Sequence, residues 1–208
     1  PWNVAPPVAD NWGWHWTMNH FDPEQIDADG KRQIASHYYP LTGPYDSMDP
    51  AIMKYQVLLM KLAGIDGIIV DWYGTADLWD YPAINARTNA MFEYIVKAGL
   101  KFCICYEDQT LDHLISQDVI DESEKYEQGI RDFQYIEATW FDSEAHLKID
   151  DRPVLLNFGP QFFKQSSEWE TMFEPLTTKP LFFTEDHRLA PAAVGAFSWP
   201  PMWKAPAD

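Results

Sequence analysis

The strongest hydrophobic pattern in the chain is a run of four residues at 67–70, which leads directly into Asp71, Trp72, Tyr73 and Gly74. A continuous apolar run favours a strand that is buried on both faces, as in a parallel sheet covered by helices. The polar and aromatic residues stand at the C-terminal end of this strand, where α/β barrels and doubly wound sheets place their functional sites. We therefore expect a buried strand with a functional tip.

A helix over residues 49–64 is predicted before this strand. Asp49 can cap the helix, Pro50 fits its first turn, and Gly64 can end it. Apolar residues recur at helical spacing within the segment, namely Ile52, Tyr55, Leu59 and Leu62. Helix, short link, buried strand and polar tip together form one αβ unit.

The alternation of helical and strand-like segments continues along the chain. Strands are predicted over residues 34–40, 100–106, 154–158, 181–184 and 194–198, and further helices over 82–99, 121–138 and 161–173. The charges of segment 121–138 are expected to form a solvated face. Repeated βα units indicate a parallel sheet, and the sequence lacks the glycine-rich phosphate loop expected of a Rossmann or flavodoxin-like sheet. The sequence therefore predicts an α/β fold, a (β/α)8 TIM barrel.

The barrel is assigned to residues 34–208 and is preceded by an irregular N-terminal arm at residues 1–33. The arm is expected to pack over the barrel, with substrate contact as the alternative. A complete barrel has eight strands and typically about 250 residues, whereas this sequence carries about six βα units. We therefore expect an incomplete barrel, with its C-terminal units supplied by a missing part of the same barrel or its open edge covered by self-association.

The charge of the chain excludes several classes of partner. A net charge of −17 argues against nucleic acid, because the phosphate backbone needs a basic surface. It also disfavours anionic membranes, and no run of eighteen apolar residues predicts a membrane span. Because the sequence begins at Pro1 rather than at a start Met, we expect a processed protein that is secreted, periplasmic or at the cell surface.

Aromatic residues are unusually frequent, with ten Trp, ten Tyr and twelve Phe making up 15% of the chain. Any single one can be a core residue, but a surplus at strand tips favours sugar recognition, because pyranose C–H faces stack on rings. Cys103 and Cys105 lie two apart in a predicted strand and should share a face. We interpret both as buried thiols, since their geometry disfavours a disulfide.

Carboxylates follow three of the predicted strands. They are Asp71, Glu107 with Asp108, and Glu185 with Asp186. Strand tips converge on one mouth of a barrel, so these acids should be neighbours in space. Converging acids among aromatics are typical of glycoside hydrolysis, in which one carboxyl donates a proton and another generates or stabilises the nucleophile. The alternative for any single acid is a helix cap or an arginine partner.

Other catalytic chemistries have weaker signals. The sequence contains no HExxH helix and no His-x-His pair at a strand end, and only His187, beside Glu185 and Asp186, could join a metal site. Serine chemistry lacks a G-x-S-x-G elbow, and both cysteines lie within a strand. We therefore expect neither a metal nor another cofactor.

Three segments resemble glycoside hydrolases of the family 71/99-like group, which includes bacterial endo-α-mannosidases and fungal α-1,3-glucanases on a (β/α)8 barrel. They are His37-Tyr38-Tyr39-Pro40, residues 64–74 with the tip Val70-Asp71-Trp72-Tyr73-Gly74, and Tyr106-Glu107-Asp108. The Asp150 to Pro153 turn and residues 195–203 support the resemblance more loosely.

The resemblance implies roles for particular residues. Tyr38 or Tyr39 would line the sugar pocket, and Trp72 with Tyr73 would form its aromatic wall. Glu107 would match the family's third-strand glutamate, which assists attack by the sugar's own 2-hydroxyl through a 1,2-anhydro intermediate. The family's acid/base carboxylate lies near the last strands, and this sequence has no matching segment.

We therefore predict a glycoside hydrolase that acts on an α-linked oligosaccharide or polysaccharide, with Glu107 and Asp71 as catalytic residues. The predicted substrate-binding residues are Tyr38, Tyr39, Trp72, Tyr73, Asp108, Glu185, Asp186 and Trp199. The alternative is a carbohydrate-binding barrel without catalysis.

Overall fold

The chain divides into two compact units in a computed structural model that describes residues 2–199. The first unit comprises Pro1–Val70 and Asp77–Phe102, and the second comprises Asp71–Ala76 and Cys103–Asp208. Two strands, β1 (Gly67–Trp72) and β2 (Lys101–Tyr106), begin in the first unit and end in the second. The ends of both strands, which carry Asp71 and Tyr106, therefore belong to the second unit.

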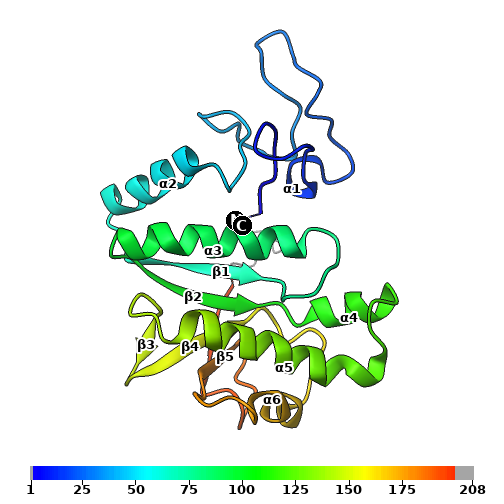
Figure 1. The fold of residues 1–208 in the computed structure, drawn as a ribbon, viewed down its shortest axis with the longest axis vertical. Helices are drawn as coiled ribbons and strands as arrows, with labels where there is room; N and C mark the ends of the chain where they lie inside the picture. The colour runs from blue at the N-terminus through cyan, green and yellow to red at the C-terminus, as the bar shows by residue number, and fades with distance from the viewer. Residues whose placement is uncertain (1, 200–208) are drawn as a thin grey trace, which may run out of the picture. The chain divides into compact units, whose positions relative to one another are not determined.

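The helices and strands follow the predicted order for most of the chain (Figure 1). The first unit contains α1 (Trp14–Thr17), α2 (Pro50–Leu62) and α3 (Tyr81–Lys97). The second unit contains α4 (Gln109–Ser116), η1 (Glu122–Glu124), α5 (Lys125–Ile136), the π-helical turn η2 (Glu137–Phe141), β3 (Lys148–Ile149), β4 (Arg152–Asn157), α6 (Ser166–Phe173), β5 (Leu181–Glu185) and β6 (Gly195–Phe197).

The strands form one sheet in the order β1-β2-β4-β5-β6, with the short β3 antiparallel to β4. The pairs β2–β4, β4–β5 and β5–β6 are parallel. In register, Tyr106 lies opposite Asn157, Asn157 opposite Thr184, and Glu185 opposite Phe197. The predicted α/β fold with a parallel sheet is thus confirmed, and closure of the sheet into a barrel stays a prediction.

Helix α2 begins and ends at the residues that its sequence indicates. The Asp49 carboxylate accepts a hydrogen bond from Ala51 N at 2.8 Å, and Pro50 occupies the first turn. Gly64 follows the helix with φ +73°, a conformation that glycine adopts without strain. The sequence therefore predicts both ends of this helix correctly.

The strand predicted over residues 34–40 is wrong. This segment is irregular with bends, and Ser36 Oγ donates a hydrogen bond to Tyr38 O at 2.7 Å. Ile34 is buried in a small cluster with Ala5 and Trp16, whereas residues 36–38 are exposed. The segment buries one apolar residue rather than a continuous face, so it gains little by pairing as a strand.

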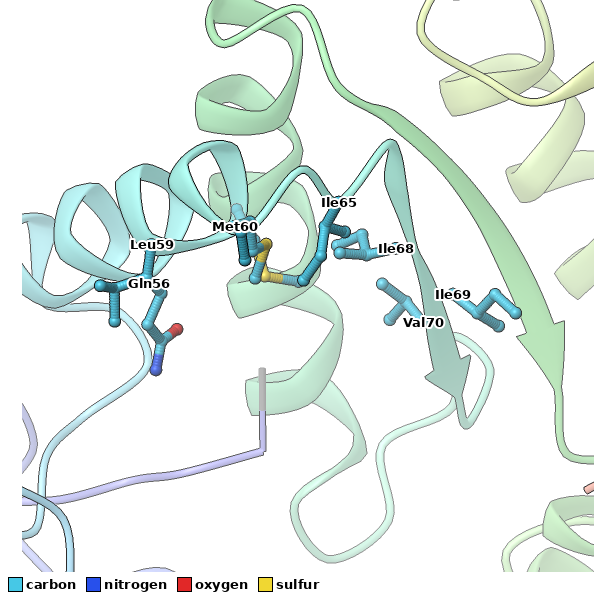
Figure 2. Close-up of a pocket in the computed structure, with 9 residues that line it drawn as sticks. Gln56, Leu59, Met60, Ile65, Ile68, Ile69 and Val70 are labelled. Carbon is cyan, nitrogen blue, oxygen red and sulfur yellow. The ribbon is translucent and has the colours of Figure 1, made fainter. Parts of the chain in front are cut away.

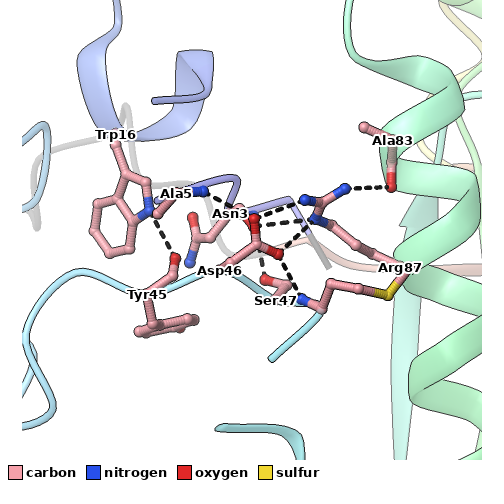
Figure 3. Close-up of polar contacts among 9 residues, drawn as sticks. Asn3, Ala5, Trp16, Tyr45, Asp46, Ser47, Ala83 and Arg87 are labelled. Carbon is pink, nitrogen blue, oxygen red and sulfur yellow. Dashed lines mark hydrogen bonds and ion pairs between the residues drawn. The ribbon is translucent and has the colours of Figure 1, made fainter. Parts of the chain in front are cut away.

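The first residues of the chain are fixed to α3 by a buried ion pair (Figure 3). Arg87 Nη2 donates to Asp46 Oδ2 at 2.7 Å, and Arg87 Nε donates to Asp46 Oδ1 at 3.1 Å. Arg87 Nε also donates to Asn3 O, while the Asp46 carboxylate accepts from Ala5 N at 2.9 Å and Met48 N at 2.7 Å. Both charged side chains are almost fully buried, so this network anchors the start of the arm and the loop before α2.

An apolar groove of about 530 Å³ lies along α2 and β1 within the first unit (Figure 2). Its walls come from Leu59 and Met60 of α2 and from Ile68, Ile69 and other residues in and before β1. Gln56 is the one polar side chain among the described residues that line it, and none of those residues is an acid or a base.

The sheet of the second unit has two different faces. One face packs against α5 and α6 through large aromatic side chains: Tyr106, Phe133, Trp169, Phe173 and Phe182. The other face carries Cys103, Cys105, Val154 and Leu156, with Phe158, Phe183 and Phe197 against them. Both thiols are buried and free, as predicted, and burial raises the pKa of Cys103 to about 12.

Candidate active site

The carboxyl ends of β1 and β2 bring two acids together. Asp71 is the fifth residue of β1, and Glu107 directly follows β2. Glu107 N donates to Trp72 O at 3.1 Å, which fixes the two strand ends side by side. The side chains of Asp71 and Glu107 are themselves hydrogen-bonded to each other. A hydrogen bond between two carboxyl groups requires a proton on one of them.

Burial decides where that proton resides. Asp71 is 8% exposed and Glu107 is half-buried, and loss of solvation raises the pKa of both carboxyls. The pKa of Glu107 rises to about 9, first through burial and then through its hydrogen bond and proximity to Asp71. The hydrogen bond from Glu107 opposes the rise for Asp71. Burial and the neighbouring Asp71 together therefore favour the protonated form of Glu107 at neutral pH.

A third acid stands at the end of β5. Glu185 is half-buried, and its charge adds to the rise in the Asp71 pKa. Burial and the adjacent Asp186 raise the pKa of Glu185 itself. Phe183 occupies the same face of β5 two residues earlier. Acidic and aromatic side chains thus share the carboxyl end of this sheet face.

Trp199 and Phe158 extend the aromatic surface of this end of the sheet. Phe158 directly follows β4 and packs against the face that carries the two cysteines. Its ring meets Trp199 edge to face at 5.0 Å between centroids, and Trp199 is half-buried. Tyr73 is half-buried too. The roles of Tyr73 and Trp199 in substrate binding stay predictions.

Trp72 does not form a wall of this site, which corrects the sequence interpretation. Its ring is fully buried, stacks on Tyr135 at 5.7 Å and meets Trp140 edge to face at 5.4 Å. Side chains alternate between the faces of a strand, so Trp72 points away from the face that carries Asp71. It is a core residue with no ring face open to a sugar.

Asp108 is a structural residue rather than a sugar ligand, which is a second correction. It is fully buried, and its carboxylate accepts hydrogen bonds from the backbone amides of Gln161, Phe162 and Phe163 at 2.7–3.1 Å. Asn157 Nδ2 donates to it as well, at 3.3 Å. These bonds hold the loop after β4, and α6 accordingly begins at Ser166, later than predicted.

The remaining predicted residues are Asp186, Tyr38 and Tyr39. Asp186 is exposed in a left-handed turn with φ +58°, and its amide donates to Phe197 O at 2.8 Å. Tyr38 and Tyr39 belong to the first unit. Tyr38 is 80% exposed, and Tyr39 OH accepts from Arg32 N at 3.1 Å. The prediction that these tyrosines line the sugar pocket stays a prediction.

Asp132 is not among the predicted site residues; it lies on α5 and is 1% exposed. Its carboxylate accepts hydrogen bonds from Thr75 of the loop after β1 and from the hydroxyl of Tyr106 at the end of β2. The expectation of a solvated charged face on this helix is therefore wrong for Asp132. The available signal was its position four residues before the apolar Ile136, on the buried side of the helix.

Among residues 2–199, no group of three or more His, Cys, Asp or Glu is placed to hold a metal ion. His187 is exposed. Within the same residues, no helix has the length and apolar character needed to cross a membrane.

Comparison with known proteins relates the chain to mannosidases, although no family model matches it. It is 28% identical over 107 residues to a glycoprotein endo-alpha-1,2-mannosidase-like protein from Danio rerio, covering 45% of this chain and 24% of that protein. The GH99 endo-alpha-mannosidase from Bacteroides thetaiotaomicron matches in fold with a TM-score of 0.59 and 21% identity. That match covers 90% of this chain and 53% of the enzyme.

A glycoside hydrolase-like protein matches with a TM-score of 0.56 and 11% identity, over 74% of this chain and 48% of that protein. The chain therefore spans about half the length of these two solved structures and 24% of the sequence relative. At these identities the likeness to the solved structures is one of fold. The predicted resemblance to the 99-like group is confirmed, because the chain is similar in sequence and fold to part of the GH99 endo-alpha-mannosidases.

Proposed function

We propose that this chain forms part of a glycoside hydrolase that cleaves an α-linked glycan, with an endo-α-mannosidase-like activity. The observation that carries the proposal is the hydrogen-bonded pair of Asp71 and Glu107 at the carboxyl ends of adjacent strands. Titratable pairs whose environments separate their pKa values are typical of general acid–base sites. The similarity to GH99 endo-alpha-mannosidases supports a glycan as the substrate.

The state of the pair suggests a division of roles. A carboxyl that keeps its proton to about pH 9 is a proton donor at neutral pH, so Glu107 suits donation. Asp71, which receives the hydrogen bond, is the member of the pair that can accept a proton from a sugar hydroxyl. The family resemblance implies instead that Glu107 assists the 2-hydroxyl. We favour Asp71 for that step, with Glu107 as the general acid of the pair.

The surroundings of the pair also suit a sugar. Phe158 and Trp199 meet edge to face at the same end of the sheet, and Glu185 adds a further acceptor for hydroxyl groups. We propose a (β/α)8 barrel as the complete architecture. The parallel pairing of β2, β4, β5 and β6 and the resemblance to the barrel-forming 99-like group support it.

The test is hydrolysis of α-1,2-linked mannosyl oligosaccharides by the complete protein, with an α-glucan as the comparison substrate. Glu107→Gln and Asp71→Asn should each lower kcat by about a hundredfold or more, the scale of a lost general acid or base. KM should change little. Glu170→Gln, an exposed acid on α6, is the matched control and should leave kcat unchanged. Binding of a glycan without cleavage would favour a carbohydrate-binding protein and overturn the proposal.

A further inference from the structure

Asp132 is a buried carboxylate whose hydrogen-bonding capacity is filled. Its Oδ1 accepts from Thr75 N at 2.9 Å, Thr75 Oγ1 at 2.7 Å and Gln128 Nε2 at 3.0 Å. Its Oδ2 accepts from Tyr106 OH at 2.8 Å. A buried carboxylate is costly unless its oxygens are satisfied, and four donors match the roughly four lone-pair sites of the group.

The donors come from the two segments that carry the acid pair. Thr75 lies four residues after Asp71, in the loop that leaves β1. Tyr106 is the last residue of β2 and precedes Glu107. Asp132, on the helix side of the sheet, therefore links the loop that follows Asp71 to the end of the strand that precedes Glu107.

The loop after β1 is shaped for this contact. Gly74 has φ +90°, and a Cβ built on it would lie 2.7 Å from Asp132 Oδ2. A residue with a side chain would meet both backbone strain and a clash at this point. Only glycine lets the loop approach closely enough for both Thr75 donors to reach the carboxylate.

We propose that Asp132 is a positioning residue that holds Asp71 and Glu107 at hydrogen-bonding distance, a role that rests on the proposed function of that pair. Tyr106 is suited to its part, because burial and the neighbouring Asp132 raise the pKa of its phenol, which stays a donor across the working pH range. The ring of Tyr106 also packs against Trp72 and Phe133, with ring centroids 6.1 Å and 5.0 Å apart. This packing leaves its hydroxyl little freedom.

Two substitutions separate positioning from simple packing. Asp132→Leu keeps the number of side-chain heavy atoms and the branch at Cγ and removes all four hydrogen bonds, whereas Asp132→Asn keeps the shape and an acceptor oxygen for Thr75. We expect the leucine variant to lose about a hundredfold in kcat, the scale of a small misplacement of catalytic groups. The asparagine variant should retain most of the activity. Tyr106→Phe removes a single bond and serves if the leucine variant does not fold.

The decisive readout is titration of the Glu107 carboxyl by NMR, which does not depend on activity. Asp71, Asp108 and His113 are the titratable groups that act on Glu107. If Asp132 positions the pair, the Glu107 pKa should fall in the leucine variant, and by less in Tyr106→Phe, because the hydrogen bond to Asp71 is weakened. Ile136→Val, a buried change on the same helix, is the control for lost packing and should leave the Glu107 pKa unchanged.

The outcomes are distinguishable. If wild-type protein cleaves no glycan, the proposed function fails, and the NMR titration still tests the role of Asp132. An unchanged Glu107 pKa in both Asp132→Leu and Tyr106→Phe would overturn the positioning role, even if both variants melt at lower temperature. The positioning role would also be overturned if Ile136→Val lowered the Glu107 pKa as much as Asp132→Leu does, for the same loss of stability.

Discussion

Replacement of Glu107 by glutamine should change how the stability of the protein depends on pH. In the folded protein the Glu107 pKa is raised from 4.5 to about 9, mainly by burial and then by Asp71. In the unfolded chain Glu107 loses its proton near its ordinary pKa. Between these two values the folded state holds more protons than the unfolded state, so the free energy of unfolding falls as the pH rises.

The magnitude follows from proton linkage. One additional bound proton gives a slope of about 1.4 kcal/mol per pH unit. From pH 5 to pH 8 the free energy of unfolding should therefore fall by up to about 4 kcal/mol. The stabilisation is fully present below pH 4.5 and is lost as the pH approaches 9. The raised pKa of Asp71 acts in the same direction, since it too favours the protonated form in the folded state.

Urea denaturation followed by tryptophan fluorescence, at intervals from pH 5 to pH 8, measures this slope. Glu107→Gln keeps a donor for the Asp71 carboxylate and cannot ionise, so the variant should be progressively more stable than wild type as the pH rises. Glu170→Gln is the control, because it makes the same chemical change on an exposed part of α6. Parallel pH dependences in wild type and Glu107→Gln would refute the assignment of the proton to Glu107.

Two further substitutions test the buried polar networks. Asp46→Ala should cost about 3–5 kcal/mol of unfolding free energy, because it leaves the Arg87 guanidinium buried without its carboxylate. The double variant Asp46→Leu with Arg87→Met should recover part of this loss in thermal melts, and no recovery would contradict the ion-pair explanation. Asp108→Ala should cost at least about 1–3 kcal/mol, the penalty for the buried Phe163 amide alone, because the part-buried amides of Gln161 and Phe162 lose the same acceptor. A loss below about 1 kcal/mol, measured by urea denaturation, would show that solvent replaces the carboxylate.

Local signals predict the elements that are strongly marked in the sequence. The cap at Asp49, the proline in the first turn and the glycine at residue 64 define α2, and the apolar run before Asp71 defines β1. The strand at residues 181–184 appears as β5 for the same reason. These signals depend on local backbone preferences and on the spacing of apolar residues. They can therefore be read without knowing which distant residues pack against the segment.

Signals that depend on distant partners could not be found in this way. Nothing near Asp108 in the sequence indicates that three amides at residues 161–163 converge on its carboxylate. The segment that holds those amides has helical composition, and tertiary contacts with Asp108 keep it from joining α6. Residues 34–40 show the opposite effect, because a segment of suitable composition buries Ile34 against Ala5 and Trp16 but pairs with no strand and remains irregular.

The alternation of side chains along the strands explains which tip residues share one face. Asp71, Glu107 and Glu185 occupy positions in phase with Cys105 and Phe183, on the face opposite the helices. Trp72, which follows Asp71, and Tyr106, which precedes Glu107, point to the opposite face.

Trp72 and Tyr106 are both buried against the helices. A motif such as Asp-Trp or Tyr-Glu at a strand end therefore contains one residue for the site and one for its support. This phase explains why Trp72 is unavailable to a sugar although it is adjacent to Asp71. It also explains how Asp132, on the helix side, reaches the hydroxyl of Tyr106 and not Glu107. Asp132 can therefore position the two acids through the backbone of Tyr106 and Thr75, without touching the acid side chains themselves.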